Sequence, residues 1–283
     1  MIKGVTTGYK ALDEIIKGYG RSELIVIGSR RAMGKTGFML SSALRLARHG
    51  LPVGIFSIEY PEKLLLKRMI SLSSGFDLRS SSELQKFLAS DKITSIEELS
   101  HLPIYIDDTR ALCVDDFEEK VQMLVEHDVR VVFIDYLQLM TGGRAGYSHR
   151  EEENADIVRD LRYVARKYKI TIVLFYSLGA YVPRKDKVET DDERMDNDMF
   201  FLQCAANGTL MKCADKMILI YRKYWYDTGE GPNARLVVKD KKSGSQQTIS
   251  LAFNPQTSEF SEKCHEDMSD KPNNQLKSEH DKN

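Results

Sequence analysis

Short runs of consecutive apolar residues, each followed by a segment with helical spacing, constrain the fold of this chain more than any other feature. A strand with one face in water alternates apolar and polar residues, whereas a strand covered on both faces reads as a continuous apolar run. Alternation of such runs with helices is typical of a mostly parallel sheet that has helices on both faces. The predicted strands are residues 24–27, 53–57, 104–106, 131–134 and 170–175. The predicted helices are residues 36–49, 64–70, 114–127 and 155–168.

Two later apolar runs, residues 217–220 and 234–238, lie close together along the chain. The segment between them contains residues 227–232 (DTGEGP), which are rich in turn formers. A short connection of this kind joins antiparallel neighbours. The chain is therefore predicted to be an α/β protein, with a mostly parallel central sheet flanked by helices and antiparallel strands at one edge.

The domain organisation follows from composition. The chain has 283 residues, of which 42% are hydrophobic and 29% charged, so it can bury one large core. The globular pattern begins within the first residues, and we expect a single domain over residues 1–260 with no additional N-terminal domain. Residues 261–283 are almost wholly polar and cannot bury enough surface to offset the entropy of ordering, so we expect a disordered tail.

Several function classes are disfavoured by the sequence. No run of about 18 apolar residues predicts a transmembrane helix, and the N-terminus lacks the apolar stretch of a signal peptide. The four cysteines include no CxxC pair, which argues against a disulfide framework or a zinc site and favours a cytoplasmic protein. A net charge of −1 argues against nonspecific coating of DNA, so any contact with nucleic acid must come from a few local residues.

A phosphate-binding loop is predicted directly after the first strand. Gly34, Lys35 and Thr36 match the end of the P-loop motif, whose backbone N–H groups and lysine hold phosphates and whose hydroxyl binds Mg²⁺. The motif places its first glycine where this chain has Ser29, and Gly28 comes one residue too early. A chance Gly-Lys-Thr in a surface turn is the alternative. The predicted nucleotide-binding residues are Ser29, Arg30, Arg31, Ala32, Met33, Gly34, Lys35 and Thr36.

Two carboxylates complete the predicted site. Four apolar residues end at Asp135, a pattern that holds Mg²⁺ beside the P-loop hydroxyl of Thr36, although a strand ending in a capping aspartate reads the same way. Glu59 follows the second strand, at the end where ligands bind in open α/β sheets. There it can orient and deprotonate an attacking water; the alternative is a solvated residue near the next helix. We predict Glu59 and Asp135 as catalytic residues, Thr36 and Asp135 as metal ligands, and ATP with Mg²⁺ as the bound groups.

The combined motifs resemble the C-terminal motor domain of the DnaB family of replicative helicases. The most specific similarity is the segment IDYLQLM at residues 134–140, and the run RRAMGKT at residues 30–36 is similar to that family's variant P-loop. Further similarity lies in residues 5–13, 56–59, 106–109, 220–222 and 239–244. The resemblance implies a RecA-like fold, ATP hydrolysis with Glu59 as catalytic glutamate, and a homo-oligomeric, hexameric ring that moves on single-stranded DNA. It also implies other replication proteins as partners, and no membrane.

The chain departs from the family pattern at positions that affect catalysis. Ser177 stands where the family has a glutamine that senses the γ-phosphate. The family's Lys-x-Arg, whose arginine acts on a neighbouring subunit's nucleotide, corresponds to Lys239-Asp240-Lys241. We predict Lys241 as the catalytic replacement, with Lys242 favoured instead if the segments are aligned on Gly244. A lysine lacks the planar fork of a guanidinium, so slow hydrolysis is expected.

The segments that face DNA in the family are also altered. Its Arg-Glu-Ser-Gly segment appears as residues 205–208 (AANG), without the arginine, and the preceding loop, residues 183–198, holds seven acidic and four basic residues. The arginine in residues 142–144 (GGR) offers one basic contact, or the segment is only a turn. Three hypotheses remain: a DnaB-type helicase motor, a stand-alone ATPase or nucleotide switch with little unwinding, and a RecA-like recombination mediator.

Overall fold

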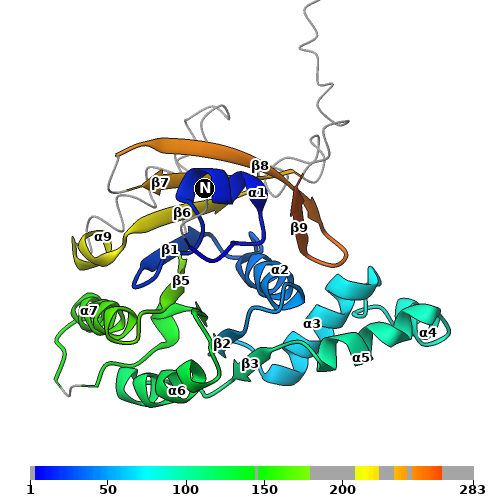
Figure 1. Ribbon diagram of the computed structural model, residues 1–283, viewed down its shortest axis with the longest axis horizontal. Coiled ribbons are helices and arrows are strands. Elements are labelled where there is room, and N and C mark those ends of the chain that lie inside the picture. The colour runs from blue at the N-terminus through cyan, green and yellow to red at the C-terminus, as the bar shows by residue number, and fades with distance from the viewer. Residues whose placement is uncertain (1–3, 144–145, 179–207, 223–232, 241–243, 263–283) are drawn as a thin grey trace, which may run out of the picture.

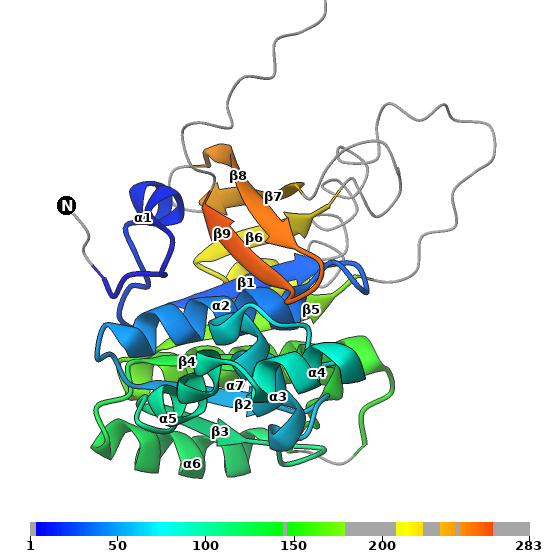
Figure 2. The same ribbon diagram turned by 90° about the vertical axis from the view of Figure 1, so that its right-hand side faces the viewer.

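The computed structural model describes residues 4–143, 146–178, 208–222, 233–240 and 244–262 (Figures 1 and 2). The following segments interpreted from the sequence lie outside these residues: Arg144, the acidic loop at 183–198, residues 205–207, the turn at 227–232, Lys241 with Lys242, and the tail beyond Glu262. The helices are α1 (Lys10–Ile16), α2 (Lys35–Arg48), α3 (Glu62–Ser74), α4 (Ser81–Leu88), α5 (Ser95–Ser100), α6 (Val114–Glu126), α7 (Arg150–Lys167) and α9 (Gly208–Cys213), with 3-10 turns η1 (Asp91–Thr94) and η2 (Leu137–Leu139). The strands are β1 (Leu24–Ser29), β2 (Val53–Ser57), β3 (Ile104–Asp107), β4 (Val131–Asp135), β5 (Thr171–Ser177), β6 (Lys216–Tyr221), β7 (Asn233–Asp240), β8 (Gln246–Asn254) and β9 (Glu259–Glu262).

One sheet forms the centre of the described chain, in the order β3-β2-β4-β5-β1-β6-β7-β8-β9. The strands from β3 to β6 are all parallel, and β7, β8 and β9 continue the sheet as antiparallel neighbours. The predicted α/β architecture is therefore confirmed. Because β1 lies beside β5 and β2 lies beside β4, the chain crosses over two strands between β1 and β2. Crossovers of this kind leave a crevice at the carboxyl ends of the strands.

Alternate residues of each central strand pack against different helix layers. Ile25 and Ile27 of β1 belong to a core shared with α1, α2 and α3, whereas Leu24 and Val26 belong to a core shared with α6, α7 and α9. Figure 1 shows α2 and α3 on one side of the sheet and α6 and α7 on the other. Both faces are covered, which explains why the parallel strands read as continuous apolar runs.

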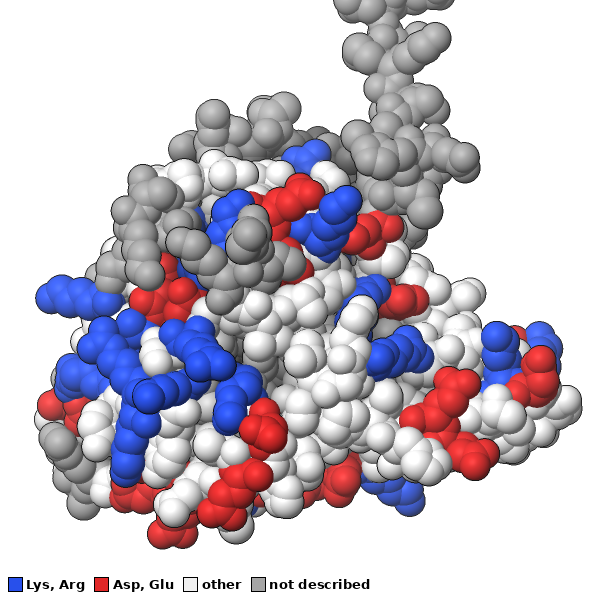
Figure 3. Space-filling model, viewed as in Figure 1, with Lys and Arg blue, Asp and Glu red and all other residues white. Residues whose placement is uncertain are grey.

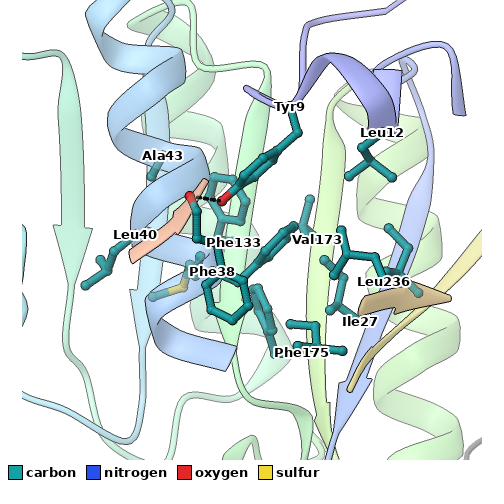
Figure 4. Close-up of a cluster of buried hydrophobic side chains, with 14 of the residues drawn as sticks. Tyr9, Leu12, Ile27, Phe38, Leu40, Ala43, Phe133, Val173, Phe175 and Leu236 are labelled. Atoms are coloured by element: carbon teal, nitrogen blue, oxygen red, sulfur yellow. Dashed lines mark hydrogen bonds between the residues drawn. The ribbon is translucent and has the colours of Figure 1, made fainter. Parts of the chain in front are cut away.

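The end of the sheet near β9 is joined to α2 through aromatic side chains. Tyr9 stacks on Phe38 of α2 with ring centroids 5.1 Å apart, and Phe38 meets Phe260 of β9 edge-on at 5.7 Å. The Tyr9 hydroxyl donates a hydrogen bond to the Phe260 carbonyl (Figure 4). These contacts hold the N-terminal segment, the helix that begins at the P-loop, and the last described strand in one core.

The predicted antiparallel pairing of the runs at 217–220 and 234–238 is confirmed, because β6 pairs antiparallel with β7; on its other side β6 also pairs in parallel with β1. Some predicted boundaries were wrong. The prediction stopped at residue 238 and missed β8 and β9, and the strand β9 extends two residues past the expected domain end at 260. β8 was missed because only Ile249, Leu251 and Phe253 face the core. Among the described residues, no helix is long and apolar enough to cross a membrane.

Candidate nucleotide-binding and hydrolysis site

A cleft of about 670 Å³ opens at the carboxyl ends of β1, β2 and β4. It is bounded by the loop after β1, by α3, and by the connection between β8 and β9. The residues that line it include Arg31, Ala32, Gly34, Lys35, Thr36, Gly37, Glu59, Arg68, Arg79, Tyr136, Ser177, Arg222, Phe253, Gln256, Thr257 and Ser258. Segments far apart in the sequence therefore meet at the position that the topology predicts for a ligand.

The loop between β1 and α2 lies at the floor of this cleft. Gly34 has a φ of 97°, and a Cβ there would lie 2.9 Å from the Phe260 ring, so the position requires glycine. Five of the eight predicted nucleotide-binding residues line the cleft, namely Arg31, Ala32, Gly34, Lys35 and Thr36. The other three do not line it: Ser29 is the buried end of β1, Met33 is buried, and Arg30 is the first residue of the loop.

Lys35 is the first residue of α2 and is only 9% exposed. Its Nζ lies 3.4 Å from the Arg30 carbonyl oxygen, within the loop itself. Burial lowers the pKa of Lys35, and the nearby carboxylates of Asp135 and Glu59 partly offset that effect. A largely desolvated ammonium at a helix N-terminus favours an anion, because the helix dipole and the free N–H groups of the first turn have the same preference.

Asp135 and Thr36 form the polar pair at the centre of the site. Thr36 Oγ1 donates to Asp135 Oδ2 at 2.7 Å, which joins the start of α2 to the end of β4. Asp135 is 0% exposed, and its other oxygen, Oδ1, is buried without a hydrogen-bond partner among the described residues. Burial, together with the charge of Glu59, raises the pKa of Asp135 to about 6 despite the hydrogen bond from Thr36 and the charge of Lys35. A buried carboxylate oxygen without a partner is a costly group that a cation would satisfy.

Glu59 lies two residues beyond β2, with its side chain exposed on the wall of the cleft. Its position is set by the pairing of β2 with β4, in which Ser57 is opposite Asp135 and the Ile58 N–H donates to the Asp135 carbonyl at 3.0 Å. The two predicted catalytic carboxylates thus come from neighbouring parallel strands. They differ in environment, since Asp135 is enclosed and Glu59 is open to water.

Arg222 and Phe253 form a wall of the cleft that sequence reasoning did not assign to the site. The Arg222 guanidinium carbon lies 3.5 Å from the Phe253 ring centroid, and its Nη1 donates to the carbonyl of Ala32 at 3.3 Å. Arg222 is 6% exposed, and burial lowers its pKa to about 10. In the sequence, residues 220–222 are distinguished only by their similarity to the DnaB family. The alternation of Ile249, Leu251 and Phe253 is the signal that could have identified β8.

The connection between β8 and β9 is held over the cleft by hydrogen bonds from Arg79 on one side and by close packing against Gly37 of α2 on the other. Arg79 Nη2 donates to the carbonyls of Pro255 and Gln256 at 3.1 and 2.9 Å, and Arg79 is itself paired with Asp77. On the other side, the Ser258 carbonyl would be 2.4 Å from a Cβ at position 37, so Gly37 permits the approach of the hairpin to α2. The hairpin therefore has a defined position relative to the P-loop.

Ser177 lies at the end of β5 and lines the cleft. Its backbone exchanges two hydrogen bonds with the Gln138 side chain, whose Nε2 donates to the Ser177 carbonyl at 2.7 Å and whose Oε1 accepts from the Ser177 N–H at 3.1 Å. The segment after β4 thereby fixes the end of β5. Of the predicted lysines, Lys239 lies in β7, whereas Lys241 and Lys242 fall outside the described residues.

The family of this chain is identified by a family model that spans the described residues. A model of the DnaB-like helicase C terminal domain matches residues 4–262. This chain belongs to that family. The replicative DNA helicase DnaB of Geobacillus stearothermophilus is 29% identical over 266 residues, covering 92% of this chain and 56% of the relative. The replicative DNA helicase DnaC of Bacillus subtilis is 28% identical, with the same coverage. The chain thus spans little more than half the length of these relatives.

Solved structures of related domains have the same fold. One of them, described as an ATPase domain, superimposes with a TM-score of 0.78 at 27% identity, covering 92% of this chain and 91% of the other. A DnaB-like replicative helicase described with its interactions with primase gives the same TM-score and identity, and 62% of that chain is covered. The predicted DnaB-type, RecA-like fold is therefore confirmed, and the family match includes every described residue of the cleft.

Proposed function

We propose that this chain is the ATP-driven motor of a DnaB-type replicative helicase, coupling ATP hydrolysis to movement along single-stranded DNA. One observation carries the proposal. Thr36 and Asp135 are joined by a hydrogen bond at the carboxyl ends of β1 and β4, with Lys35 and Glu59 facing the same cleft. A phosphate-binding lysine, a metal-binding pair and a candidate base are the parts that ATP hydrolysis requires.

ATP would bind with its phosphates over the loop at residues 30–36. The first-turn N–H groups of α2 and the desolvated ammonium of Lys35 are the groups that hold phosphate oxygens. The guanidinium of Arg222, supported from below by the Phe253 ring, supplies a plane at the edge of the cleft. Guanidinium planes stack on the faces of nucleobases, so we assign this wall to the adenine.

The residues around Asp135 fit Mg²⁺. Mg²⁺ prefers oxygen ligands and is usually bound by one or two carboxylates together with substrate phosphates. Thr36 supplies a hydroxyl, and Asp135 supplies a buried carboxylate whose Oδ1 has no partner within the described part of the chain. When bound, the ion neutralises charge on the phosphate oxygens. Its charge would also favour the ionised form of Asp135, which burial disfavours.

Glu59 is the candidate general base. It is exposed on the cleft wall and so can reach a water molecule, whereas Asp135 is enclosed and hydrogen-bonded to Thr36. Glu59 would accept a proton from the attacking water as the water adds to the γ-phosphorus and the bond from this phosphorus to the β–γ bridging oxygen breaks, releasing ADP and phosphate. Lys35 would hold the phosphate oxygens on which charge develops in that step.

We infer a homo-oligomeric ring, with six subunits as the family resemblance implies, in which Lys241 of one subunit completes the nucleotide site of the next. Lys242 is the alternative in the other alignment. A lysine offers one point of charge in place of a bidentate guanidinium, so we expect slow turnover with weak stimulation by DNA. Other replication proteins are further expected partners.

The test is ATP hydrolysis by the full chain, with and without a single-stranded oligo(dT), alongside the molar mass from light scattering. The proposal predicts hydrolysis, an oligomer of several subunits, and a measurable increase in turnover with oligo(dT). A monomer whose hydrolysis ignores DNA would instead favour the stand-alone ATPase or nucleotide switch. Absence of any hydrolysis in the presence of Mg²⁺ would overturn the assignment of the cleft.

A further inference from the structure

A basic surface lies on the face of the molecule that is opposite the nucleotide cleft. Figure 3 shows Lys and Arg side chains gathered where Figure 1 draws α7. We call it the α7 basic surface, and it consists of Arg21, Arg159, Arg162, Arg166, Lys169 and Lys212.

Hydrogen bonds bring these residues together from three segments. Arg162 Nη1 donates to the Ser22 carbonyl at 2.9 Å, which places the turn that carries Arg21 against α7. Arg159 Nη1 lies 3.4 Å from Thr209 Oγ1, which places α9 and its Lys212 on the other side of the helix. All three segments precede or flank the starts of β1, β5 and β6, whereas the cleft lies at the strands' carboxyl ends.

The charges of this surface are incompletely balanced. Arg162 is paired with Asp215, with Nη2 donating to Oδ1 at 2.8 Å, and Arg159 is paired with Asp156. Arg21, Arg166 and Lys169 are exposed and have no carboxylate partner within the described residues. Like charges held close together repel one another and raise the local positive potential, which attracts an anionic ligand.

An exposed aromatic ring lies within the same surface. Tyr163 is 59% exposed, although large aromatic side chains are generally buried at least in part. On α7 it is four residues after Arg159 and three before Arg166, so its ring lies on the same helix face as these two cations. Lys167 Nζ is also 5.8 Å from the ring centroid. Cations interleaved with an exposed aromatic ring are the combination that binds single-stranded nucleic acid, since bases stack while phosphates pair.

We propose that the α7 basic surface binds single-stranded nucleic acid at a site separate from the cleft and from any contact inside a ring. The segment from Arg159 to Arg166 spans about 10 Å of helix, so the surface contacts a short stretch of backbone. An acidic protein would satisfy the cations but leave the exposed face of Tyr163 unexplained, which is why nucleic acid is favoured.

The experiment is binding of fluorescent oligo(dT) to the nucleotide-free full chain, followed by anisotropy over a range of salt. The double variant Arg166→Glu with Lys169→Glu should lower affinity at least about tenfold at low salt and reduce the salt slope by about 1.4, which is about 0.7 for each phosphate contact. The matched control is Lys10→Glu with Lys92→Glu, which reverses two exposed cations outside this surface and should leave affinity close to that of the parent.

A second pair of variants tests the aromatic ring. Tyr163→Ala should weaken binding about fivefold or more, the usual effect of losing one stacked base, and Tyr163→Phe should retain the parent affinity. ATP turnover without DNA should be unchanged in all these variants, so it reports on the cleft independently. Equal loss of affinity in the double variant and its control, or no loss in either, would overturn the proposal. Binding of an acidic polypeptide but not oligo(dT) would overturn it in favour of a protein partner.

Discussion

Replacing Asp135 by asparagine should change how the stability of the nucleotide-free chain depends on pH. Asp135 is fully buried, its Oδ1 has no partner among the described residues, and burial raises its pKa from 3.8 to about 6. The folded state therefore holds the carboxyl proton more tightly than the unfolded chain does. The contribution of this proton to stability is present in full below pH 3.8 and is lost as the pH rises through 6.

The magnitude follows from the size of the shift. Each pKa unit corresponds to about 1.4 kcal/mol, so a shift of roughly two units is worth about 3 kcal/mol in total. About 2 kcal/mol of this should be lost between pH 4 and pH 8, because the unfolded carboxyl already begins to ionise at the lower end. Asparagine cannot ionise and still offers an oxygen to the hydroxyl of Thr36, so its own contribution should not vary over this range.

The assay is urea unfolding in EDTA without nucleotide, at several pH values from 4 to 8. The unfolding free energy of the parent minus that of Asp135→Asn should fall by about 2 kcal/mol as the pH rises. Asp91→Asn, at an exposed position that does not line the cleft, is the matched control and should give a flat difference. A flat difference for Asp135→Asn as well would refute the conclusion that this carboxylate is desolvated and unpaired.

Three further outcomes are expected. Lys35→Ala should abolish binding of a labelled ATP analogue in an equilibrium titration, because the desolvated ammonium at the start of α2 is lost; unchanged affinity would remove the lysine from the site. In a preparation shown to be oligomeric, Lys241→Arg should raise steady-state ATP turnover and Lys241→Ala should lower it, and no response to either would mean that the site is completed by another residue. Phe38→Ala should lower the unfolding free energy by about 3–5 kcal/mol, since Phe38 is fully buried between Tyr9 and Phe260; a loss below about 1 kcal/mol would contradict the described packing.

The parallel part of the sheet was predictable because burial on both faces leaves an unambiguous pattern. The apolar runs that became β1, β2, β4 and β5 needed no tertiary information to be identified as buried strands. β8 instead alternates buried and exposed residues, and its first residues, Gln246 and Gln247, are exposed. A strand with only one face in the core resembles a polar loop in sequence, because half of its residues face water.

The candidate site was predictable for those residues that carry a group needed to bind phosphate or metal and that also follow or end a buried strand. Lys35, Thr36 and Asp135 each follow or end an apolar strand, so parallel pairing alone brings them to one edge. Arg222 and Phe253 could not be placed in the same way. Their approach to the P-loop depends on how β8 and β9 fold back across α2, through Gly37 and the bonds from Arg79. Long-range packing of that kind has no local sequence signal.

The most direct test of the proposed ATPase site is the ATP turnover and nucleotide affinity of Glu59→Gln, compared with the parent chain and with Glu62→Gln. Glu62 is exposed three residues further along the chain and does not line the cleft, so its substitution makes the same change of charge outside the site. We predict that Glu59→Gln binds Mg-ATP like the parent and turns over at least about a hundredfold more slowly, as expected for a lost general base. We predict that Glu62→Gln is unchanged. Turnover by Glu59→Gln at the parent rate would contradict the assignment of Glu59 as the base that activates water.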